Sequence, residues 1–177
     1  MPNAFTIFTT SMSDIIFLNR TSSSGKSTIA RALREKLPSF SYFASDQLAE
    51  AGFRPLTRTP EERERFFAGF HYSIAAFADA GSQLIVEHIV ESIEWAQMLQ
   101  HLLSRHQVFW VGVQAPQEEL QRREIARGDR GIGEALYHLR THDFVSYDLN
   151  VDSTKAPEEN ALTIVGAWSQ WQSSFSS

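Results

Sequence analysis

The chain has 177 residues, which is enough for one domain with a substantial core and short for two. Hydrophobic residues make up 42% and charged residues 21%, as in soluble globular proteins, and no apolar run is long enough to span a bilayer. The net charge of −5 argues against a general nucleic-acid-binding protein, and without cysteine there are no disulfides or thiolate metal sites. We therefore expect a cytoplasmic protein with no nucleic-acid or membrane partner.

The two ends of the chain are expected to lie outside the folded unit. Residues 1–12 lack the basic start and long apolar run of a signal peptide, so we predict a peripheral N-terminal extension, with Met12 as an alternative start to Met1. Residues 13–172 are predicted to form a single domain, and the serine-rich residues 173–177 a frayed tail. The sequence does not distinguish a monomer from a homo-oligomer.

The stretch from Ser13 to Leu37 has the order of a phosphate-binding loop. Residues 15–18 are all apolar, which predicts a buried strand, and apolar residues recur at every fourth position from Ile29 to Leu37, which predicts a helix with one buried face. Between them lies Ser22-Ser23-Ser24-Gly25-Lys26-Ser27-Thr28. Such a loop lets backbone N–H groups and a helix N-terminus surround phosphate oxygens. We predict a nucleotide site, with Lys26 on the β- and γ-phosphates and the Ser27 hydroxyl on Mg²⁺.

The loop departs from the usual pattern at one position. The pattern has glycine five residues before Gly25, where this chain has Arg20. A Cβ at that position strains or narrows the turn. An ordinary serine-rich turn capped by Ser24 or Ser27 is therefore the alternative interpretation.

The rest of the chain alternates strands and helices. We expect a strand at 41–44, a loop at 52–61 and a helix at 61–80 that ends at Gly81 and places Phe66, Phe67, Phe70, Ile74 and Phe77 in the core. There follow a strand at 84–86, a helix at 95–103, a strand at 108–113, a charged helix at 118–127, a strand at 147–151 and a helix at 157–171. This order predicts an α/β fold, a doubly wound, parallel, five-stranded sheet.

Asp46 directly follows the second predicted strand. In a parallel sheet, ligands bind beyond the carboxyl ends of the strands, where a phosphoryl acceptor would need a base. We therefore predict that Asp46 is the general base for an acceptor hydroxyl. The alternative is that Asp46 is the N-cap of a helix starting near Gln47.

Three polar residues follow the third strand. Glu87 has the place of a Walker B acid and is expected to hold a magnesium-bound water or the acceptor hydroxyl. His88 is expected to contact substrate or to pack in the core, and Glu91 lies one short step further. Together with Arg54 of the 52–58 loop, these residues form the predicted acceptor site.

Four arginines surround the start of a glycine-rich segment at 128–133, namely Arg122, Arg123, Arg127 and Arg130. Arginines beside a mobile loop can close over a triphosphate and neutralise the charge of the transferred phosphoryl group, which predicts a lid around 118–140. Glu118 and Glu119 lie four residues before the first two arginines, so a salt-bridged solvent face is the alternative.

Several segments resemble the chloramphenicol phosphotransferase-like family of P-loop kinases. They are the strand and loop at 16–33, Ala-Gly-x-x-Leu-Ile-Val-Glu-His at 80–88, Phe-Trp-Val-Gly-Val-x-x-Pro at 109–116, Arg-Arg-Glu-x-Ala-Arg-Gly-Asp-Arg at 122–130 and Tyr-Asp-Leu-Asn-Val-Asp-Ser-Thr at 147–154. The resemblance runs in order from about Ile15 to Trp168. Two departures are Arg20-Thr21 in place of a Gly-Gly pair and Glu87 in place of an aspartate.

The resemblance implies an adenylate-kinase-like sheet and ATP-dependent phosphorylation of a small molecule's hydroxyl. It implies Asp46 as the base, and Lys26 and Ser27 as the phosphate and Mg²⁺ contacts. It further implies that Arg123, Arg127 and Arg130 serve the nucleotide and lid, and that Asp152, Ser153 and Thr154 lie near the adenine.

The hypothesis is therefore an ATP:alcohol phosphotransferase whose acceptor is a chloramphenicol-like antibiotic or another hydroxylated metabolite. One alternative is a kinase of nucleotide sugars in the manner of zeta toxins. The other is a non-catalytic nucleotide-binding protein, which Arg20 favours and which the retained Asp46 and arginines disfavour. A GTPase is disfavoured because no Asn-Lys-x-Asp segment is present.

Overall fold

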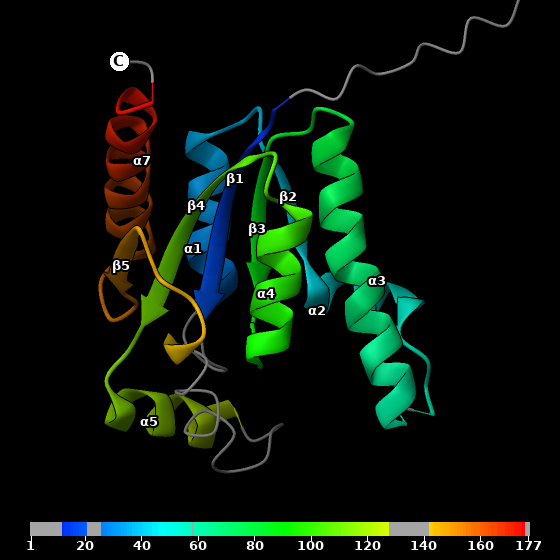
Figure 1. The fold of residues 1–177 in the computed structure, drawn as a ribbon. Coiled ribbons are helices and arrows are strands. Elements are labelled where there is room, and N and C mark those ends of the chain that lie inside the picture. Colours follow the sequence, from blue (N-terminus) through cyan, green and yellow to red (C-terminus); the bar gives the residue numbers. More distant parts are fainter. Residues whose placement is uncertain (1–11, 21–25, 58, 128–141, 176–177) are drawn as a thin grey trace, which may run out of the picture.

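A parallel sheet of five strands forms the centre of the molecule, with strand order β2-β3-β1-β4-β5 (Figure 1). The strands are β1 (Asp14–Arg20), β2 (Ser41–Ala44), β3 (Leu84–His88), β4 (Gln107–Gln114) and β5 (Leu149–Asp152). Every neighbouring pair in this order is parallel. The structure thus confirms the predicted doubly wound, parallel, five-stranded sheet.

The structure is a computed structural model, and it describes residues 12–20, 26–57, 59–127 and 142–175. Of Arg20, Lys26, Ser27 and Arg127 it describes only the backbone. The predicted loop residues Ser22, Ser23, Ser24 and Gly25, the lid residue Arg130 and most of the N-terminal extension lie outside the described residues.

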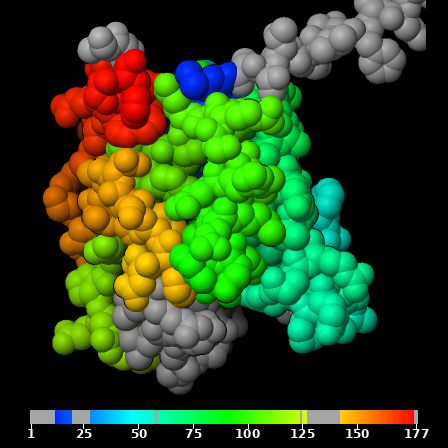
Figure 2. All heavy atoms as spheres, viewed as in Figure 1, coloured from blue at the N-terminus to red at the C-terminus, as the bar shows by residue number. Residues whose placement is uncertain are grey.

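The helices cover both faces of the sheet. They are α1 (Lys26–Lys36), α2 (Ser45–Leu48), α3 (Pro60–Asp79), α4 (Ile93–Leu102), α5 (Gln117–Arg127) and α7 (Pro157–Ser173), with a π-helical turn η1 (Ala49–Phe53). Helices α1 and α7 pack together on one face, and α3 and α4 on the other. Figure 2 shows α4 and the segment 142–152 side by side over the front of the molecule.

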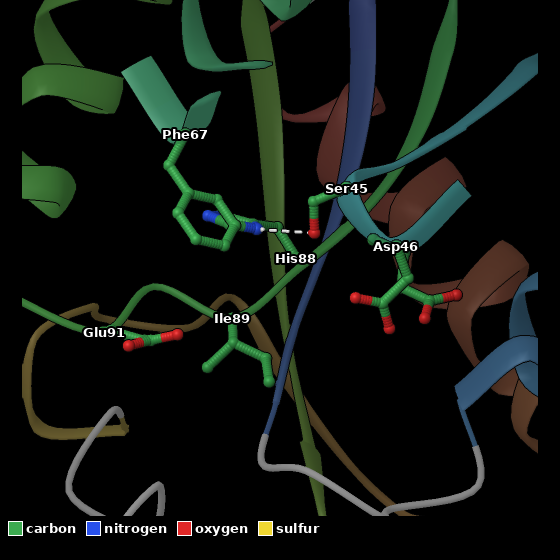
Figure 3. Close-up of a pocket in the computed structure, with 7 residues that line it drawn as sticks. Ser45, Asp46, Phe67, His88, Ile89 and Glu91 are labelled. Carbon is green, nitrogen blue, oxygen red and sulfur yellow. Dashed lines mark hydrogen bonds between the residues drawn. The ribbon is translucent and has the colours of Figure 1, made fainter. Parts of the chain in front are cut away.

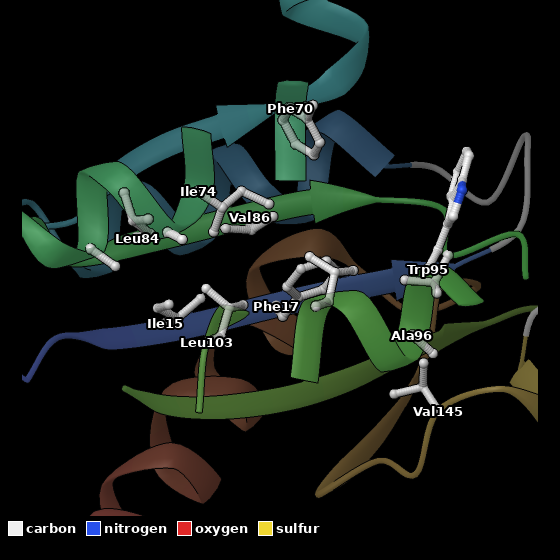
Figure 4. Close-up of a cluster of buried hydrophobic side chains, with 14 residues drawn as sticks. Ile15, Phe17, Phe70, Ile74, Leu84, Val86, Trp95, Ala96, Leu103 and Val145 are labelled. Carbon is white, nitrogen blue, oxygen red and sulfur yellow. The ribbon is translucent and has the colours of Figure 1, made fainter. Parts of the chain in front are cut away.

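The central strand β1 supplies both layers of the core. Successive side chains of a strand point to opposite faces, so Ile15 and Phe17 pack under α3 and α4, whereas Ile16 and Leu18 pack under α1 and α7. Figure 4 shows the first of these layers, where Phe17 lies below Phe70 and Ile74 of α3. Because β1 is buried on both faces, its residues 15–18 are continuously apolar, as the sequence predicted.

The segment after β2 differs from the prediction of a loop at 52–61. Helical turns continue through α2 and η1 to Phe53, and Gly52, with φ of 90°, ends them. Helix α3 then starts at Pro60 with a capping box between Thr59 and Glu62. The predicted stop at Gly81 is confirmed, because Gly81 has φ of 89° and its N–H donates to the Ala78 carbonyl.

Two further predictions need correction. Phe77 is 50% exposed and packs only at the edge of the core, with its ring 5.4 Å from that of Phe43. The last strand begins at Leu149 rather than at 147. Asp148, directly before β5, bonds to Trp110 of β4 twice: its N–H donates to the Trp110 carbonyl at 2.9 Å, and its carboxylate accepts from the Trp110 N–H at 2.8 Å.

Candidate active site

A small pocket opens beyond the carboxyl ends of β2 and β3, where the sequence predicted the acceptor site (Figure 3). Its volume is about 50 Å³, and it is lined by Ser45, Asp46, Phe67, Glu87, His88, Ile89 and Glu91. The register of the strands explains this convergence, since Glu87 is level with Ala44 of β2 and with Leu18 of β1. A pocket of this size receives one chemical group of a ligand rather than a whole metabolite.

Asp46 projects from the first turn of α2 at the rim of this pocket (Figure 3). The residue is exposed, so its carboxylate is accessible to a ligand. The N-cap of α2 is Ala44, and no side chain caps the helix. The alternative interpretation of Asp46 as an N-cap is therefore wrong.

Glu87 is buried, with 3% of its surface exposed, and its carboxylate accepts a short hydrogen bond from the Tyr42 hydroxyl. Tyr42 lies on the neighbouring strand β2, so the contact ties the two strands together below the pocket. A buried carboxylate needs such donors because its charge has lost the solvation of water. Glu87 thus belongs to the floor of the site.

His88 packs inside the core and also lines the pocket. Its ring is 2% exposed and stacks on Trp95 with 5.6 Å between the ring centroids. Its Nδ1 lies 3.1 Å from Ser45 Oγ, and its Nε2 lies 3.0 Å from Nε2 of His71. His88 therefore packs in the core, one of its two predicted roles, whereas its contact with a substrate stays a prediction.

Glu91 forms the outer edge of the pocket with an arginine that the sequence analysis missed. Arg63 of α3 donates to Glu91 Oε2 at 2.5 Å, and its guanidinium carbon lies 4.8 Å from the Phe67 ring and 5.4 Å from the Trp95 ring. Such a cation–π stack holds the guanidinium flat against the aromatic wall. Arg54 lies beside this wall, 6.0 Å from the Phe67 ring, and not in the lining of the pocket.

Arg123 docks α5 on the turn after β5. Its guanidinium donates to the Ser153 hydroxyl at 3.2 Å and to the Ser153 carbonyl at 3.0 Å, and its Nε donates to Glu119 at 2.6 Å. Arg122 pairs with the same Glu119 and is otherwise exposed. The solvent-face interpretation thus holds for Arg122, whereas Arg123 turns inward to one of the residues predicted to lie near the adenine.

The turn after β5 is ordered by its own polar residues. The Asp152 carboxylate accepts hydrogen bonds from the N–H and the hydroxyl of Thr154 at 2.8 and 2.7 Å, and these bonds lower the pKa of Asp152. Asn160 of α7 donates to the Asp152 carbonyl at 2.8 Å. Beside this turn, at the ends of β4 and β5, lies an open pocket of about 420 Å³ that includes Gln114, Pro116 and Asn150.

A second polar chain joins the loop after β3 to the segment before β5. Asn19, at the end of β1, accepts from the Val90 N–H at 2.9 Å and donates to the Tyr147 hydroxyl at 2.7 Å, which in turn lies 2.8 Å from His142 Nδ1. Burial raises the pKa of Tyr147 to about 12. Its ring packs so closely on Gly112 that a Cβ there would lie 2.8 Å from Tyr147 Cδ2.

The helix that follows the predicted phosphate loop is suited to anions. Helix α1 begins at Lys26, directly beyond the carboxyl end of β1. Its first turn holds no acidic residue, whereas α3, α5 and α7 each have two glutamates there. Acids favour a helix N-terminus, so their absence leaves the positive end of α1 available to phosphate.

The comparison with protein families decides what this arrangement belongs to. The model described as "Chloramphenicol phosphotransferase-like protein" matches residues 13–169. The chain belongs to the chloramphenicol phosphotransferase-like family. A candidate O-phosphotransferase of Mycobacterium tuberculosis strain H37Rv is 33% identical over 86 residues, which are 48% of this chain and 38% of that protein. The chain thus matches little more than a third of the length of this relative.

Solved structures of kinases share the fold of this family member. A sugar kinase from Janibacter sp. superimposes with a TM-score of 0.69 at 17% identity, over 89% of this chain and 95% of that one. The APS kinase CysC of Mycobacterium tuberculosis superimposes with a TM-score of 0.67 at 17% identity, over 89% of this chain and 98% of that one. The shikimate kinase of Aquifex aeolicus superimposes with a TM-score of 0.66 at 15% identity, over 88% of this chain and 96% of that one. The fold is that of the P-loop kinases.

Two kinds of feature are absent from the residues that the structure describes. None of their helices combines the length and hydropathy that crossing a membrane requires. Nor do the histidines, aspartates and glutamates of the described segments group into a set of three suited to a metal ion.

Proposed function

We propose that this protein is an ATP-dependent phosphotransferase that phosphorylates a hydroxyl group of a small molecule, with Asp46 as the general base. The observation that supports this most is the position of Asp46. It is an exposed carboxylate, without a capping role, at the rim of a pocket that ends two parallel strands. The family of the chain points to the same chemistry. The lack of cysteine fits a cytoplasmic enzyme.

The proposed chemistry is a simple proton transfer coupled to substitution. The acceptor places its hydroxyl in the pocket, Asp46 takes the hydroxyl proton, and the oxygen bonds to the transferred phosphoryl group while the bond from that group to ADP breaks and ADP leaves. ATP with Mg²⁺ supplies that group when bound. Glu87 and His88 form the floor under the hydroxyl, and Glu91 with Arg63 forms its outer edge. Arg54 is close enough to contact the part of the acceptor outside the pocket.

The nucleotide would be held by residues on the other side of the site. These are Ser22, Ser23, Ser24, Gly25, Lys26, Ser27 and Thr28 of the loop and start of α1, with Ser27 as the Mg²⁺ contact, and Arg123, Arg127, Arg130, Asp152, Ser153 and Thr154. The acid-free start of α1 fits a bound triphosphate. The anchoring of Arg123 on Ser153 gives the proposed lid a fixed base.

The acceptor is a chloramphenicol-like antibiotic or another hydroxylated metabolite. The test is a screen of hydroxyl compounds, chloramphenicol first, for ATP-dependent phosphorylation by the purified protein. Asp46→Asn should keep ATP binding and lose at least a hundredfold in turnover, as expected for a general base. Glu50→Gln is the matched control, because Glu50 is an exposed acid of the adjoining turn η1 outside the pocket lining.

Four outcomes would contradict the proposal in different ways. Unchanged turnover of Asp46→Asn would remove the base assignment. ATP binding that is lost in Lys26→Ala, without phosphorylation of any acceptor, would favour a non-catalytic nucleotide-binding protein. Should the wild type fail to bind ATP while Arg20→Gly binds it, the loop is closed by the arginine. Phosphorylation of nucleotide sugars alone would point to a zeta-toxin-like kinase.

A further inference from the structure

Three polar side chains form a buried chain that ends in the acceptor pocket. Ser45 begins α2, His88 ends β3, and His71 lies in the middle of α3. The contacts are 3.1 Å from Ser45 Oγ to His88 Nδ1 and 3.0 Å between the two Nε2 atoms of the histidines. The exposed fractions are 7%, 2% and 0% for Ser45, His88 and His71. The proton transfer to Asp46 makes no use of His71, so its position calls for a separate explanation.

The protons of this chain are restricted by its geometry. Two imidazole nitrogens 3.0 Å apart form a hydrogen bond only if one carries hydrogen and the other a lone pair. Both rings are buried among Phe67, Phe70 and Trp95, which favours neutral imidazoles, and burial lowers the pKa of His71 to about 4. Two arrangements are then available. Either His71 donates to His88, or His88 donates to His71.

The second nitrogen of His71 distinguishes the two arrangements. His71 Nδ1 is buried and has no hydrogen-bond partner among the residues that the structure describes. If His88 donated, His71 would carry its hydrogen on this unpartnered Nδ1. Buried N–H groups without an acceptor are rarer in proteins than acceptors without a donor. The geometry therefore favours hydrogen on His71 Nε2, which donates to His88.

This arrangement determines what Ser45 presents to a ligand. When His88 accepts at Nε2, its own hydrogen lies on Nδ1 and is donated to Ser45 Oγ. The Ser45 hydroxyl does not cap α2, and within the described residues its only hydrogen-bond partner is His88. Its hydrogen is therefore available to the pocket that Ser45 lines.

We propose that His71 is a positioning residue that, through His88, holds the Ser45 hydroxyl as a hydrogen-bond donor to an oxygen of the phosphoryl acceptor. This rests on the proposed function for the identity of the ligand, but not for the arrangement of the protons. Ser45 then selects acceptors with a hydroxyl, ether or carbonyl oxygen next to the reacting group. Compounds with only an N–H at that place lose this hydrogen bond, because the Ser45 hydrogen then has no acceptor on the ligand.

The arrangement of the protons can be measured without any substrate. In protein labelled with ¹⁵N-histidine, the nitrogen shifts and their couplings to ring protons report which nitrogen of each histidine carries hydrogen. We expect hydrogen on Nε2 of His71 and on Nδ1 of His88. The reverse pattern, or a doubly protonated His88 at neutral pH, would overturn the proposal. This result does not depend on finding an acceptor, so it stands apart from the test of the phosphotransferase activity.

Kinetics with an acceptor from the screen test the role of the chain. Ser45→Ala should raise KM for the acceptor about tenfold and leave KM for ATP unchanged, because one hydrogen bond to the acceptor is lost. His71→Phe should give a similar increase, and the double variant no more than either alone. His71→Gln should restore the wild-type value, since its amide can donate in place of Nε2–H.

A merely structural role of His71 would give a different result. In that case Ser45→Ala and His71→Phe would multiply in their effects, or KM for ATP would rise together with KM for the acceptor. His106→Gln is the matched control, because His106 is a buried histidine outside the pocket lining, with Nε2 3.1 Å from Asp79. Its KM for the acceptor should equal that of the wild type. An acceptor KM unchanged in Ser45→Ala would overturn the proposal.

Discussion

Two histidine-containing chains flank the site, and they differ in how their direction is set. In the chain through Asn19, the Val90 backbone N–H can only donate, so it makes Asn19 Oδ1 the acceptor and Asn19 Nδ2 the donor to Tyr147. The Tyr147 hydroxyl thus accepts from Asn19, and it also lies 2.8 Å from His142 Nδ1. In the chain through His88, the contacts with Ser45 and His71 both join groups that can either donate or accept. Its direction depends on the burial of one nitrogen of His71.

The comparison indicates that the Asn19 hydrogen-bond chain has a structural role, whereas the direction of the hydrogen bonds in the His88 chain can change. A backbone donor cannot change its role, so the Asn19 chain ties β1, the loop after β3 and the segment before β5 in one arrangement. The His88 chain can reverse without moving a heavy atom, and it ends at the pocket rather than in the backbone. We therefore expect changes in the Asn19 chain to affect stability most, and changes in the His88 chain to affect ligand recognition most.

Removal of Asn19 should have the largest effect on stability. Asn19→Ala leaves the buried Val90 N–H without its acceptor and the Tyr147 hydroxyl without its donor, and it opens a cavity at the end of β1. We expect a loss of about 3 kcal/mol in the free energy of unfolding. Urea denaturation measures it. Asn150→Ala is the control, since the exposed Asn150 only accepts a hydrogen bond from Gln114, and a loss as large as in Asn19→Ala would contradict the comparison.

The pH dependence of stability should report the buried His71. Its pKa of about 4 in the folded protein lies below the ordinary value of 6.5, so the unfolded chain binds more protons between these values. The free energy of unfolding should therefore fall as the pH falls from 7 to 5, by about 2 kcal/mol from this residue. In His71→Phe this part of the decrease should be absent. An equal decrease in wild type and variant would show that His71 is not buried in its neutral form.

The fold could be predicted from the sequence because it depends on the spacing of hydrophobic residues and on the order of strands and helices along the chain. Burial can be predicted directly from the continuous apolar run at 15–18 and from the four-residue spacing of Trp95 and Leu99. Trp95 and Leu99 are both in the core. The missed boundaries have local causes. The π-helical turn η1 includes residues 52 and 53 of the expected loop, although Gly52 already has a non-helical φ of 90°. The strand β5 begins at Leu149, directly after Asp148, which bonds to the backbone of Trp110.

The site was predictable where it depends on strand ends and not where it depends on contacts between elements. Asp46 follows β2, and Glu87 and His88 end β3, so the structure brings all three to one pocket. The helical spacing of apolar residues is enough to place His71 on the buried face of α3, four residues before Ala75. It does not show that His71 lies opposite His88. Arg63 likewise looks like an exposed helix residue until α4 brings Trp95 beside it. Such pairings depend on how helices pack, which the sequence pattern does not report.

Gly112 lies on the crowded side of the Asn19 chain, so adding a side chain there should destabilise the protein. In Gly112→Ala the new Cβ would lie 2.4 Å from Asn150 Oδ1 and 2.8 Å from the ring of Tyr147, which its hydrogen bonds hold in place. We expect a loss of about 1–2 kcal/mol in the free energy of unfolding. Gly166→Ala in α7 should instead stabilise the protein by about 0.5–1 kcal/mol, because no atom lies within 4 Å of the added Cβ. Equal effects of the two changes on the free energy of unfolding would show that Tyr147 moves away from the added Cβ without cost.

The smallest effect is expected on the surface of α5, where Glu119 pairs with two arginines. Hydrogen bonds from Arg122, and then from Arg123, lower the pKa of Glu119 to about 2. NMR titration of the Glu119 carboxyl carbon should therefore show a midpoint well below the ordinary 4.5, which rises in Arg122→Ala. Because the folded pKa is the lower one, any stability from these pairs is present above pH 4.5 and lost toward pH 2.

The same titration shows whether Arg123 is held from two sides. If Ser153 anchors it independently, Arg122→Ala should leave the Arg123 side chain in place and raise the Glu119 midpoint only in part. Arg122→Ala combined with Arg123→Ala should raise it to the ordinary value, and 1 M salt should raise it in the wild type by screening. If the Glu119 midpoint reached the ordinary value in Arg122→Ala alone, Arg123 would no longer contact Glu119 once Arg122 is removed. The base of the proposed lid would then depend on Ser153 alone.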